Sequence, residues 1–512
     1  MSIFGPEFEK IWPKAGAALQ LTEFGKKLLK QCENIKKPEQ KDVDINEFKR
    51  KSSNFPLEFG TNTCRVMSQP KDRYPNIQKQ ISSAYPVIHE RVLQLYLDFL
   101  EHKCQYGYPK EQNLYTGMSL SNFVQRLLDK RCVAFVGDSD SYLLLDGEKG
   151  EGHKSYPNVG QPNENGPLIL KNCLSYDEVK LSALLSISSL SELLNDGNRF
   201  NNGIPEKNLT KIEREGVVMG IIGARFERPL FMEYQDVIIS SDQNVAHRGY
   251  GYEESESEDT AKDDVNLKRM LEYRKLWRKF YQEKDFLYHK TPSDKQRFAF
   301  CKMSDTNAEI FDNILMKKRY TITFDTLLLE AQSRAEEFNK QAYIHIVGIG
   351  LGVWKKASHQ TEIFLETFSQ RVRHLLPKLN NIGVLNFSWF HKTEWHDLKD
   401  KGFIESPSHP LGGILTFMNK RNPAEKLKAD YENMLLIISY AWDGNSLPGN
   451  EFWFGSLNGS NDPSTACSTL ITELHNPHIN QQWVCGQNLH IASTAYGIVH
   501  ISDYVKTISK QL

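Results

Sequence analysis

Short apolar runs alternate with amphipathic stretches from about residue 120 to the end of the chain. Runs of consecutive apolar residues predict strands that are buried on both faces. These runs are residues 216–226, 234–240, 342–347, 383–389 and 434–441. Apolar residues that recur every three or four positions predict helices. These stretches are residues 176–194, 267–281, 324–338 and 361–376. With two short strands around an Asp/Ser turn in 131–145, the alternation predicts an α/β fold with a mixed sheet.

The chain before residue 116 follows a different pattern. Amphipathic helices are predicted over residues 19–32 and 87–102, and the polar, Lys-rich stretch 36–54 between them is predicted to be a loose connection. We therefore divide the chain into a helical N-terminal module, residues 1–115, and an α/β domain, residues 116–512. The module is interpreted as a packing element or as a docking site for a protein partner.

The charge of the chain favours neither nucleic acid nor an anionic membrane as a partner. Its 63 Lys+Arg and 64 Asp+Glu residues give a net charge of −1. The acidic run 253–264 is predicted to be a solvated loop. No window has the length and apolar character of a membrane span, and the first residues lack the apolar core of a signal peptide. The predicted location is the cytoplasm, which is also compatible with a bacterial effector delivered into a host cell without a cleaved signal.

The cysteines and histidines indicate no metal site. The eight cysteines are scattered, without a CxxC pair or other metal-ligand spacing, and HExxH is absent. A disulfide framework is therefore not expected, and a reducing compartment is favoured. Cys467 and Ser468 are followed by His475, but no nucleophile elbow or thiol-protease signature surrounds them. We predict that Cys467 packs in the core.

Acidic residues cluster directly after the predicted strand 434–441. Asp443, Glu451 and Asp462 follow within a loop that is rich in glycine and flanked by tryptophans. Carboxylates serve as acids, bases or guanidinium ligands, and loops at the carboxyl ends of buried strands commonly hold sites. The alternative is a tight turn with solvated acids. The recurrent glycines, the tryptophans and the two amides Asn445 and Asn450 favour a site.

Two further loops carry residues that suit a phosphorylated ligand. Gly348, Gly350 and Gly352 follow the strand 342–347, where exposed backbone N–H groups bind phosphate well, although neither a Walker motif nor a complete GxGxxG is present. The adjacent Trp354 is interpreted either as a cover for a base or ribose or as a core residue. The Asn-rich loop 195–203 suits ribose hydroxyls or a diphosphate, and its composition is equally typical of ordinary turns.

The segment after strand 216–226 contains both basic and acidic side chains. Arg225 and Arg228 are candidates for neutralising phosphate, and Glu227 or Glu233 for accepting a hydrogen bond from an adenine amine. An internal ion-pair network among the same residues is an equally good interpretation.

Five of these segments together resemble a known family. They read NDGNR (195–199), IGARFERPLFMEYQ (222–235), YIHIVGIGLGVWK (343–355), KRNPAEKL (420–427) and YAWDGNSLPGNEFWFGSL (440–457). They are similar to the macrodomain-like ADP-ribosylarginine hydrolases, a family that includes the bacterial effector MavL. The resemblance covers about residues 120–485. It implies a macrodomain/PARG-like three-layer α/β/α sandwich with ADP-ribose as the ligand, and it implies hydrolysis without a metal or other cofactor.

The resemblance also implies roles for individual residues. Asp443 and Glu451 would activate water and hold the leaving guanidinium, with Asp462 as the third catalytic carboxylate. The other predicted ligand-binding residues are Asn445, Asn450, Gly348, Gly350, Leu351, Gly352, Val353, Trp354, Asn195, Asp196, Arg199 and Glu233. The predicted partners are ADP-ribose and an ADP-ribosylated protein.

The chain also departs from related families. The GxGxG loop precedes the acidic loop, which reverses the order of loops in ordinary macrodomains, and the paired glutamates of PARG enzymes are absent. The alternative function is a reader or adaptor that binds ADP-ribose without cleaving it.

Overall fold

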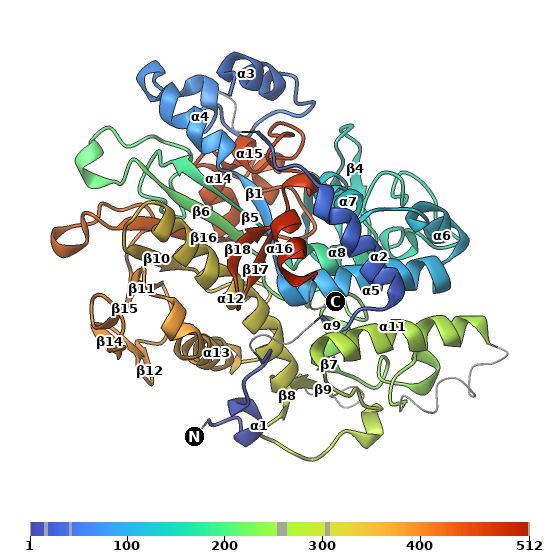
Figure 1. Cartoon of the computed structure of the whole chain (residues 1–512). Helices are drawn as coiled ribbons and strands as arrows, with labels where there is room; N and C mark the ends of the chain where they lie inside the picture. The colour runs from blue at the N-terminus through green and yellow to red at the C-terminus, as the bar shows by residue number, and fades with distance from the viewer. Residues whose placement is uncertain (1, 15–18, 40–42, 253–263, 303–307, 510–512) are drawn as a thin grey trace.

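The computed structural model describes residues 2–14, 19–39, 43–252, 264–302 and 308–509. A ten-stranded mixed sheet forms its centre (Figure 1). The strands, in spatial order, are β14 (Gly402–Glu405), β15 (Gly413–Asn419), β11 (Ile382–Ser388), β10 (Ala342–Ile346), β16 (Leu435–Ala441), β6 (Glu215–Ile221), β5 (Leu185–Glu192), β1 (Tyr85–His89), β17 (His490–Ser493) and β18 (Gly497–His500). Of the predicted acidic loop, 253–264, residues 253–263 lie outside the described residues.

Five neighbouring strands of this sheet run parallel. Strands β15, β11, β10, β16 and β6 pair in that order, so their carboxyl ends meet at one edge. Every residue of β10 and β11 is buried, because both faces of these strands are covered. From β10 the chain moves outward to β11 and β15 and then returns on the other side of β10 to form β16. Such a reversal of strand order creates a crevice at the carboxyl ends of the two strands, where α/β proteins usually bind ligands.

Helices and short 3-10 turns connect and cover the strands. The longer helices are α2 (Glu23–Gln31), α3 (Ile45–Ser53), α4 (Tyr74–Ser82), α5 (Glu90–Tyr106), α6 (Pro109–Tyr115), α7 (Leu120–Asp129), α8 (Tyr176–Ser182), α11 (Val265–Tyr281), α12 (Asn313–Glu337), α13 (Gln360–Leu375) and α16 (Ile501–Ile508). The elements nearest the candidate site are β2 (Ala134–Val136), β3 (Ser141–Leu143), η10 (Asn450–Phe454) and α14 (Asn461–Ala466). Helix α12 is buried along most of its length and contacts strands from β11 to β18, so it joins the two halves of the sheet.

Several predicted elements differ from the observed ones. The predicted helix 176–194 ends at Ser182, and its second half is the strand β5. The predicted strand 234–240 is mainly the short helix α9 (Tyr234–Val237) followed by the two-residue strand β7 (Ile238–Ile239). The stretch 36–54, predicted to be a loose connection, contains helix α3. The other strands and helices predicted after residue 120 are present, which confirms the α/β fold with a mixed sheet.

The first part of the chain contributes a strand to the sheet. The predicted helix 87–102 begins only at Glu90, and β1 directly before it pairs with β5 on one side and β17 on the other. In addition, Arg73 forms an ion pair with the buried Glu192 of β5 at 2.6 Å. Residues before 116 are thus tied to the rest of the molecule by main-chain pairing, and the division of the chain at residue 115 stays a prediction.

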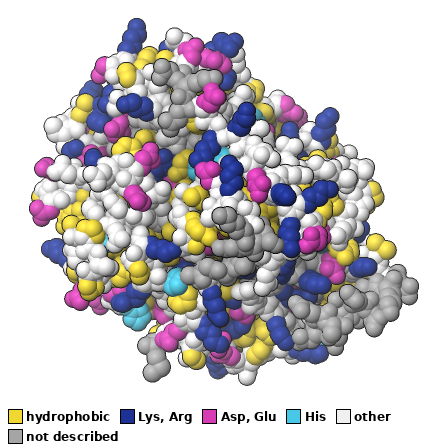
Figure 2. All heavy atoms as spheres, viewed as in Figure 1, with side chains coloured by type: hydrophobic (Ala, Val, Ile, Leu, Met, Phe, Trp, Pro, Cys, Tyr) yellow, Lys and Arg dark blue, Asp and Glu magenta, His cyan; other side chains and the backbone are white. Residues whose placement is uncertain are grey.

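The surface carries both signs of charge. On the face drawn in Figure 2, Lys and Arg side chains are interspersed with Asp and Glu side chains. This mixture agrees with the net charge of −1. In the part of the chain that the structure describes, none of the helices has the length and apolar character required to cross a bilayer.

Candidate active site

The acidic loop closes on itself between β16 and α14. Asp462, in the first turn of α14, accepts the backbone N–H of Gly449 at 2.7 Å and that of Asp443 at 3.4 Å. Gly449 has a φ of 105°, which a glycine adopts without steric cost. Glu451 follows in η10, where one of its carboxylate oxygens lies 3.4 Å from the Ser460 hydroxyl, which donates to it. The loop therefore brings the carboxyl groups of Asp443, Glu451 and Asp462 together.

The three carboxyl groups hold their protons more tightly than isolated carboxyl groups. Burial and the charge of Glu451 raise the pKa of Asp443 to about 8, against the opposing effect of Arg225. Burial and the charges of Asp443 and Glu451 raise the pKa of Asp462, and burial raises that of Glu451. Like charges this close cannot all be ionised at low cost. The raised pKa of Asp443 favours its protonated form near neutral pH, and a protonated carboxyl group among acidic neighbours suits a proton donor.

Asn450 positions Asp443. Its side-chain carbonyl accepts the backbone N–H of Phe135 at 2.8 Å, while its amide nitrogen donates to the Phe135 carbonyl at 3.2 Å and to the Asp443 carboxylate. Asn445 donates to the same carbonyl at 3.3 Å, and its own side-chain oxygen is buried with no hydrogen-bond partner among the described residues. The predicted contacts of these two amides with ribose stay a prediction, and in this structure Asn450 bonds to the protein on both sides.

The short strand β2 and the loop after it were not predicted to form part of the site. Phe135 in β2 lies far from the acidic loop in sequence, and no local motif marks it. Its ring centre lies 4.9 Å from the guanidinium of Arg225, which also donates to Glu227 at 2.8 Å and to the Gly137 carbonyl at 3.2 Å. One terminal nitrogen of Arg225 is buried and has no hydrogen-bond partner among the described residues.

Of the two interpretations of the segment after β6, the structure shows the ion-pair network. Arg225 pairs with Glu227, and Arg228 lies 3.7 Å from Asp140. The buried carboxylate of Glu233 accepts the backbone N–H of Arg225 at 3.2 Å and the side chain of Arg319 in α12 at 3.1 Å. Both oxygens of Glu233 are thus occupied by protein donors, and its predicted contact with adenine stays a prediction.

The glycine-rich loop lies directly beside the segment after β6. A Cβ atom at Gly223 would come within 2.8 Å of the Gly350 nitrogen, so the two backbones can approach this closely only because residue 223 is glycine. Trp354 lies 6.0 Å from the Arg225 guanidinium, measured from the ring centre. Val353 is 90% exposed. Because helix α13 begins only at Gln360, the loop does not run directly into a helix N-terminus.

The Asn-rich loop 195–203 is packed against the acidic loop. Arg199 donates to the Gly459 carbonyl and its own carbonyl accepts the Gly459 N–H at 3.1 Å. The side chains of Asn195 and Asp196 are used locally, since Asn195 accepts the Gly197 N–H at 2.9 Å and Asp196 accepts from Asn422 at 2.9 Å. The structure therefore places this loop against the end of the acidic loop at Gly459, with the side chains of Asn195 and Asp196 holding its shape.

The sites predicted on the strand ends thus occupy one region. The loops after β6, β10 and β16 lie at the same edge of the sheet, and β2 and residues 195–203 contact the acidic loop. Within the described ranges, no three His, Cys, Asp or Glu side chains are placed so as to hold a metal ion.

Comparison with known proteins identifies relatives over the whole chain. A family model described as "ADP-ribosylhydrolase MavL-like" matches residues 46–507. ADP-ribosylarginine hydrolase CG2909 of Drosophila melanogaster is 48% identical over 510 residues, which are 99% of this chain and 98% of that protein. ADP-ribosylarginine hydrolase CG3568 of the same organism is 48% identical over 500 residues, which are 97% of this chain and 95% of that protein. The family match begins at residue 46, well before residue 120, where the sequence motifs place the start of the resemblance.

Proposed function

Since this chain belongs to the MavL-like ADP-ribosylhydrolase family, as its motifs predict, we propose that it removes ADP-ribose from modified arginine side chains of proteins. The observation that carries this proposal is the cluster of three carboxyl groups after β16, whose pKa values are all raised by their surroundings. The names of the two fly relatives support arginine as the modified residue.

The reaction requires a proton donor and a proton acceptor on either side of one bond. Water adds its oxygen to ribose C1, the bond from C1 to the guanidinium nitrogen breaks, and a proton is delivered to that nitrogen. Asp443, with a pKa of about 8, is the donor in this proposal. Glu451 has a buried oxygen without a described hydrogen-bond partner, so it is free to take the proton from water. The proton that Glu451 takes from water then passes through the cluster to Asp443, which restores the donor.

Asp462 and Asn450 act as positioning residues. Both oxygens of Asp462 accept backbone N–H groups of the acidic loop, which fixes the distance between Asp443 and Glu451. Asn450 orients the Asp443 carboxyl group and anchors it to β2. This refines the predicted catalytic role of Asp462, because its contacts lie within the loop.

The rest of the ligand is proposed to lie along the glycine-rich loop. Backbone N–H groups of Gly348, Gly350, Gly352, Val353 and Trp354 suit the diphosphate, whereas those of Ile349 and Leu351 donate to protein carbonyls. A guanidinium nitrogen of Arg225 without a partner among the described residues lies near Trp354. The unpartnered side-chain oxygen of Asn445 suits a ribose hydroxyl. No step of this mechanism passes through a metal ion. We also propose that the sheet is of the macrodomain/PARG-like kind, which the reversal of strand order between β10 and β16 supports.

The deciding experiment is the release of free ADP-ribose from an arginine-ADP-ribosylated protein. Serine- and glutamate-linked substrates are the controls for linkage. We expect arginine-selective release by the wild type and a loss of about 10²–10⁴-fold in Asp443→Asn and Glu451→Gln, because each variant removes one partner in proton transfer. The exposed Asp430→Asn and Glu432→Gln are matched controls and should retain activity.

The alternative function predicts a different result. A reader would bind ADP-ribose in calorimetry, release none from any of the three linkages, and bind the ligand equally well after Asp443→Asn. That outcome would contradict the hydrolase proposal.

A further inference from the structure

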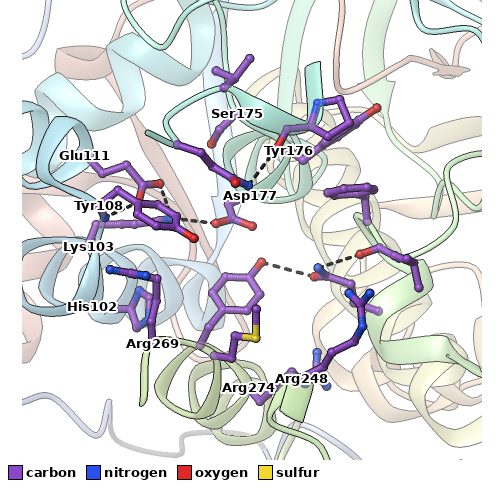
Figure 3. Close-up of a pocket in the computed structure, with 18 of the residues that line it drawn as sticks. His102, Lys103, Tyr108, Glu111, Ser175, Tyr176, Asp177, Arg248, Arg269 and Arg274 are labelled. Atoms are coloured by element: carbon purple, nitrogen blue, oxygen red, sulfur yellow. Dashed lines mark hydrogen bonds and ion pairs between the residues drawn. The ribbon is translucent and has the colours of Figure 1, made fainter. Parts of the chain in front are cut away.

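A cavity lies between α5, α8, α11 and the segment 230–250 (Figure 3). Its volume is about 290 Å³, near the lower limit of pockets that hold small molecules. None of the residues assigned above to the carboxylate site lines it. In Figure 3, His102 and Tyr108 face the open space from one side, Arg248 lies across from them, and Tyr176 closes the end opposite Arg269.

Two of the cations that line this cavity are neutralised by the protein. Lys103 forms ion pairs with Glu111 at 2.5 Å and with Asp177 at 2.7 Å. Arg274 forms an ion pair with Asp236 at 2.8 Å. The positive charges of Lys103 and Arg274 are therefore balanced by these carboxylates and are not available to an anionic ligand.

The other two arginines are not neutralised in this way. Neither Arg248 nor Arg269 forms an ion pair with a described carboxylate. Arg269 lies over the ring of Tyr108, 3.8 Å from its centre, and donates to the Tyr106 carbonyl at 2.6 Å. The Nε of Arg248 is buried and has no hydrogen-bond partner among the described residues. Two arginines without carboxylate partners among the described residues, in a cavity that tyrosines also line, suit a ligand that combines an anion with a flat ring.

Two buried polar side chains of the lining have unused hydrogen-bonding atoms. Gln243 is 2% exposed, and its amide nitrogen donates to the Ile238 carbonyl at 2.8 Å, which fixes its orientation. Its side-chain oxygen has no described partner and accepts only N–H or O–H donors. His102 is 6% exposed, and neither ring nitrogen has a described hydrogen-bond partner. Unsatisfied groups buried this deeply are costly, and a ligand with complementary groups would satisfy them.

We propose that this cavity binds an aminopurine nucleotide with one phosphate, of which adenosine monophosphate is the simplest example. The phosphate pairs with Arg248 and Arg269, and the ring lies against the tyrosines. The exocyclic amine donates to the Gln243 oxygen, while His102 offers one donor and one acceptor to the ring edge. The site is distinct from the carboxylate cluster, and this proposal does not depend on the hydrolase activity.

Calorimetric titration of the full chain with adenosine monophosphate tests the proposal. The charge-removing variants are Arg248→Gln and Arg269→Gln. Lys275→Gln, on the same helix as Arg269 but outside the cavity, is the matched control. We expect measurable binding by the wild type and by Lys275→Gln, and binding at least about tenfold weaker in each arginine variant, since charge-assisted hydrogen bonds contribute ~1.5–3 kcal/mol.

Parallel titrations with pyrophosphate and with adenosine separate the anion from the ring. The proposal requires that both bind more weakly than adenosine monophosphate. It is overturned if wild-type binding is undetectable, if the arginine variants bind as tightly as the wild type, or if pyrophosphate binds as tightly as the nucleotide. Hydrolase assays of the same variants are independent of these outcomes.

Discussion

The chemistry of the candidate site depends on the pKa values of single carboxyl groups, which their neighbours in the structure determine. Asp443 has Glu451 and Asp462 as acidic neighbours, and Arg225 only partly offsets their charge. The sequence predicts these three acids because they lie close together in one loop. It does not predict Phe135, which anchors Asn450 from a strand more than three hundred residues earlier, because nothing local signals that contact.

The proton-donor role of Asp443 predicts a pH dependence. The donor must be protonated, so kcat/KM should fall as the pH rises through about 8, the pKa of this group. Glu227 raises this pKa and pairs with Arg225, whose charge lowers it. Glu227→Gln removes a negative charge and frees Arg225, so both effects lower the pKa of Asp443. The falling limb of the pH–rate profile should therefore move to lower pH. The shift should be about half a pH unit if the charge of Glu227 contributes ~0.7 kcal/mol to the protonation of Asp443.

The pH–rate profiles of wild type, Glu227→Gln and the exposed Glu432→Gln provide the measurement. Glu432→Gln should leave the limb in place, since this side chain lies on the surface before β16. A limb that stays in place in Glu227→Gln, or one that moves to higher pH, would show that Asp443 is not the titrating donor.

At the scale of elements, strands that consist mainly of apolar residues are the ones that the sequence predicts correctly. Strands β10 and β16 are of this kind, and the loops after them were predicted to be sites. Strand β5 was predicted to be helical because half of it is serine. Its serines are buried through specific partners, Ser189 with His475 at 2.9 Å and Ser191 with the Leu470 N–H at 3.0 Å. Such partners are supplied by tertiary structure, which overrides local propensity.

The contact between the loops after β6 and β10 gives a prediction at this scale. In Gly223→Ala, the new methyl group would lie 2.8 Å from the Gly350 nitrogen, so the two loops must separate. We expect a loss of about 1–3 kcal/mol in the free energy of unfolding and a higher KM, because the proposed diphosphate site is displaced. Denaturant unfolding and steady-state kinetics provide the measurements. Gly352→Ala is the control for stability, since its methyl group would have no heavy atom within 4 Å. Equal stabilities of the two variants would contradict the prediction.

At the scale of the whole molecule, the first part of the chain is built into the sheet. Strand β1 lies between β5 and β17, near the middle of one half of the sheet. The buried Glu473 near the other end of the chain accepts hydrogen bonds from the Val66 N–H at 2.5 Å and from Ser52. The amphipathic pattern before residue 116 correctly indicates helices there. It does not reveal β1, because the apolar residues of this five-residue strand lie directly before a helix and continue the helical pattern.

This arrangement predicts that residues 116–512 do not fold alone. Without β1, strands β5 and β17 lose their shared neighbour, and the buried Glu192 and Glu473 lose partners from Arg73 and Val66. Unpaired buried strands and carboxylates are each costly, so we expect the truncated chain to be aggregated or to lack a cooperative thermal transition. Co-expression with residues 1–115 should restore a soluble complex that melts cooperatively, because the missing strand can then pair in trans. A truncated chain that is soluble alone and melts like the full-length protein would instead show that residues 1–115 form a separable module.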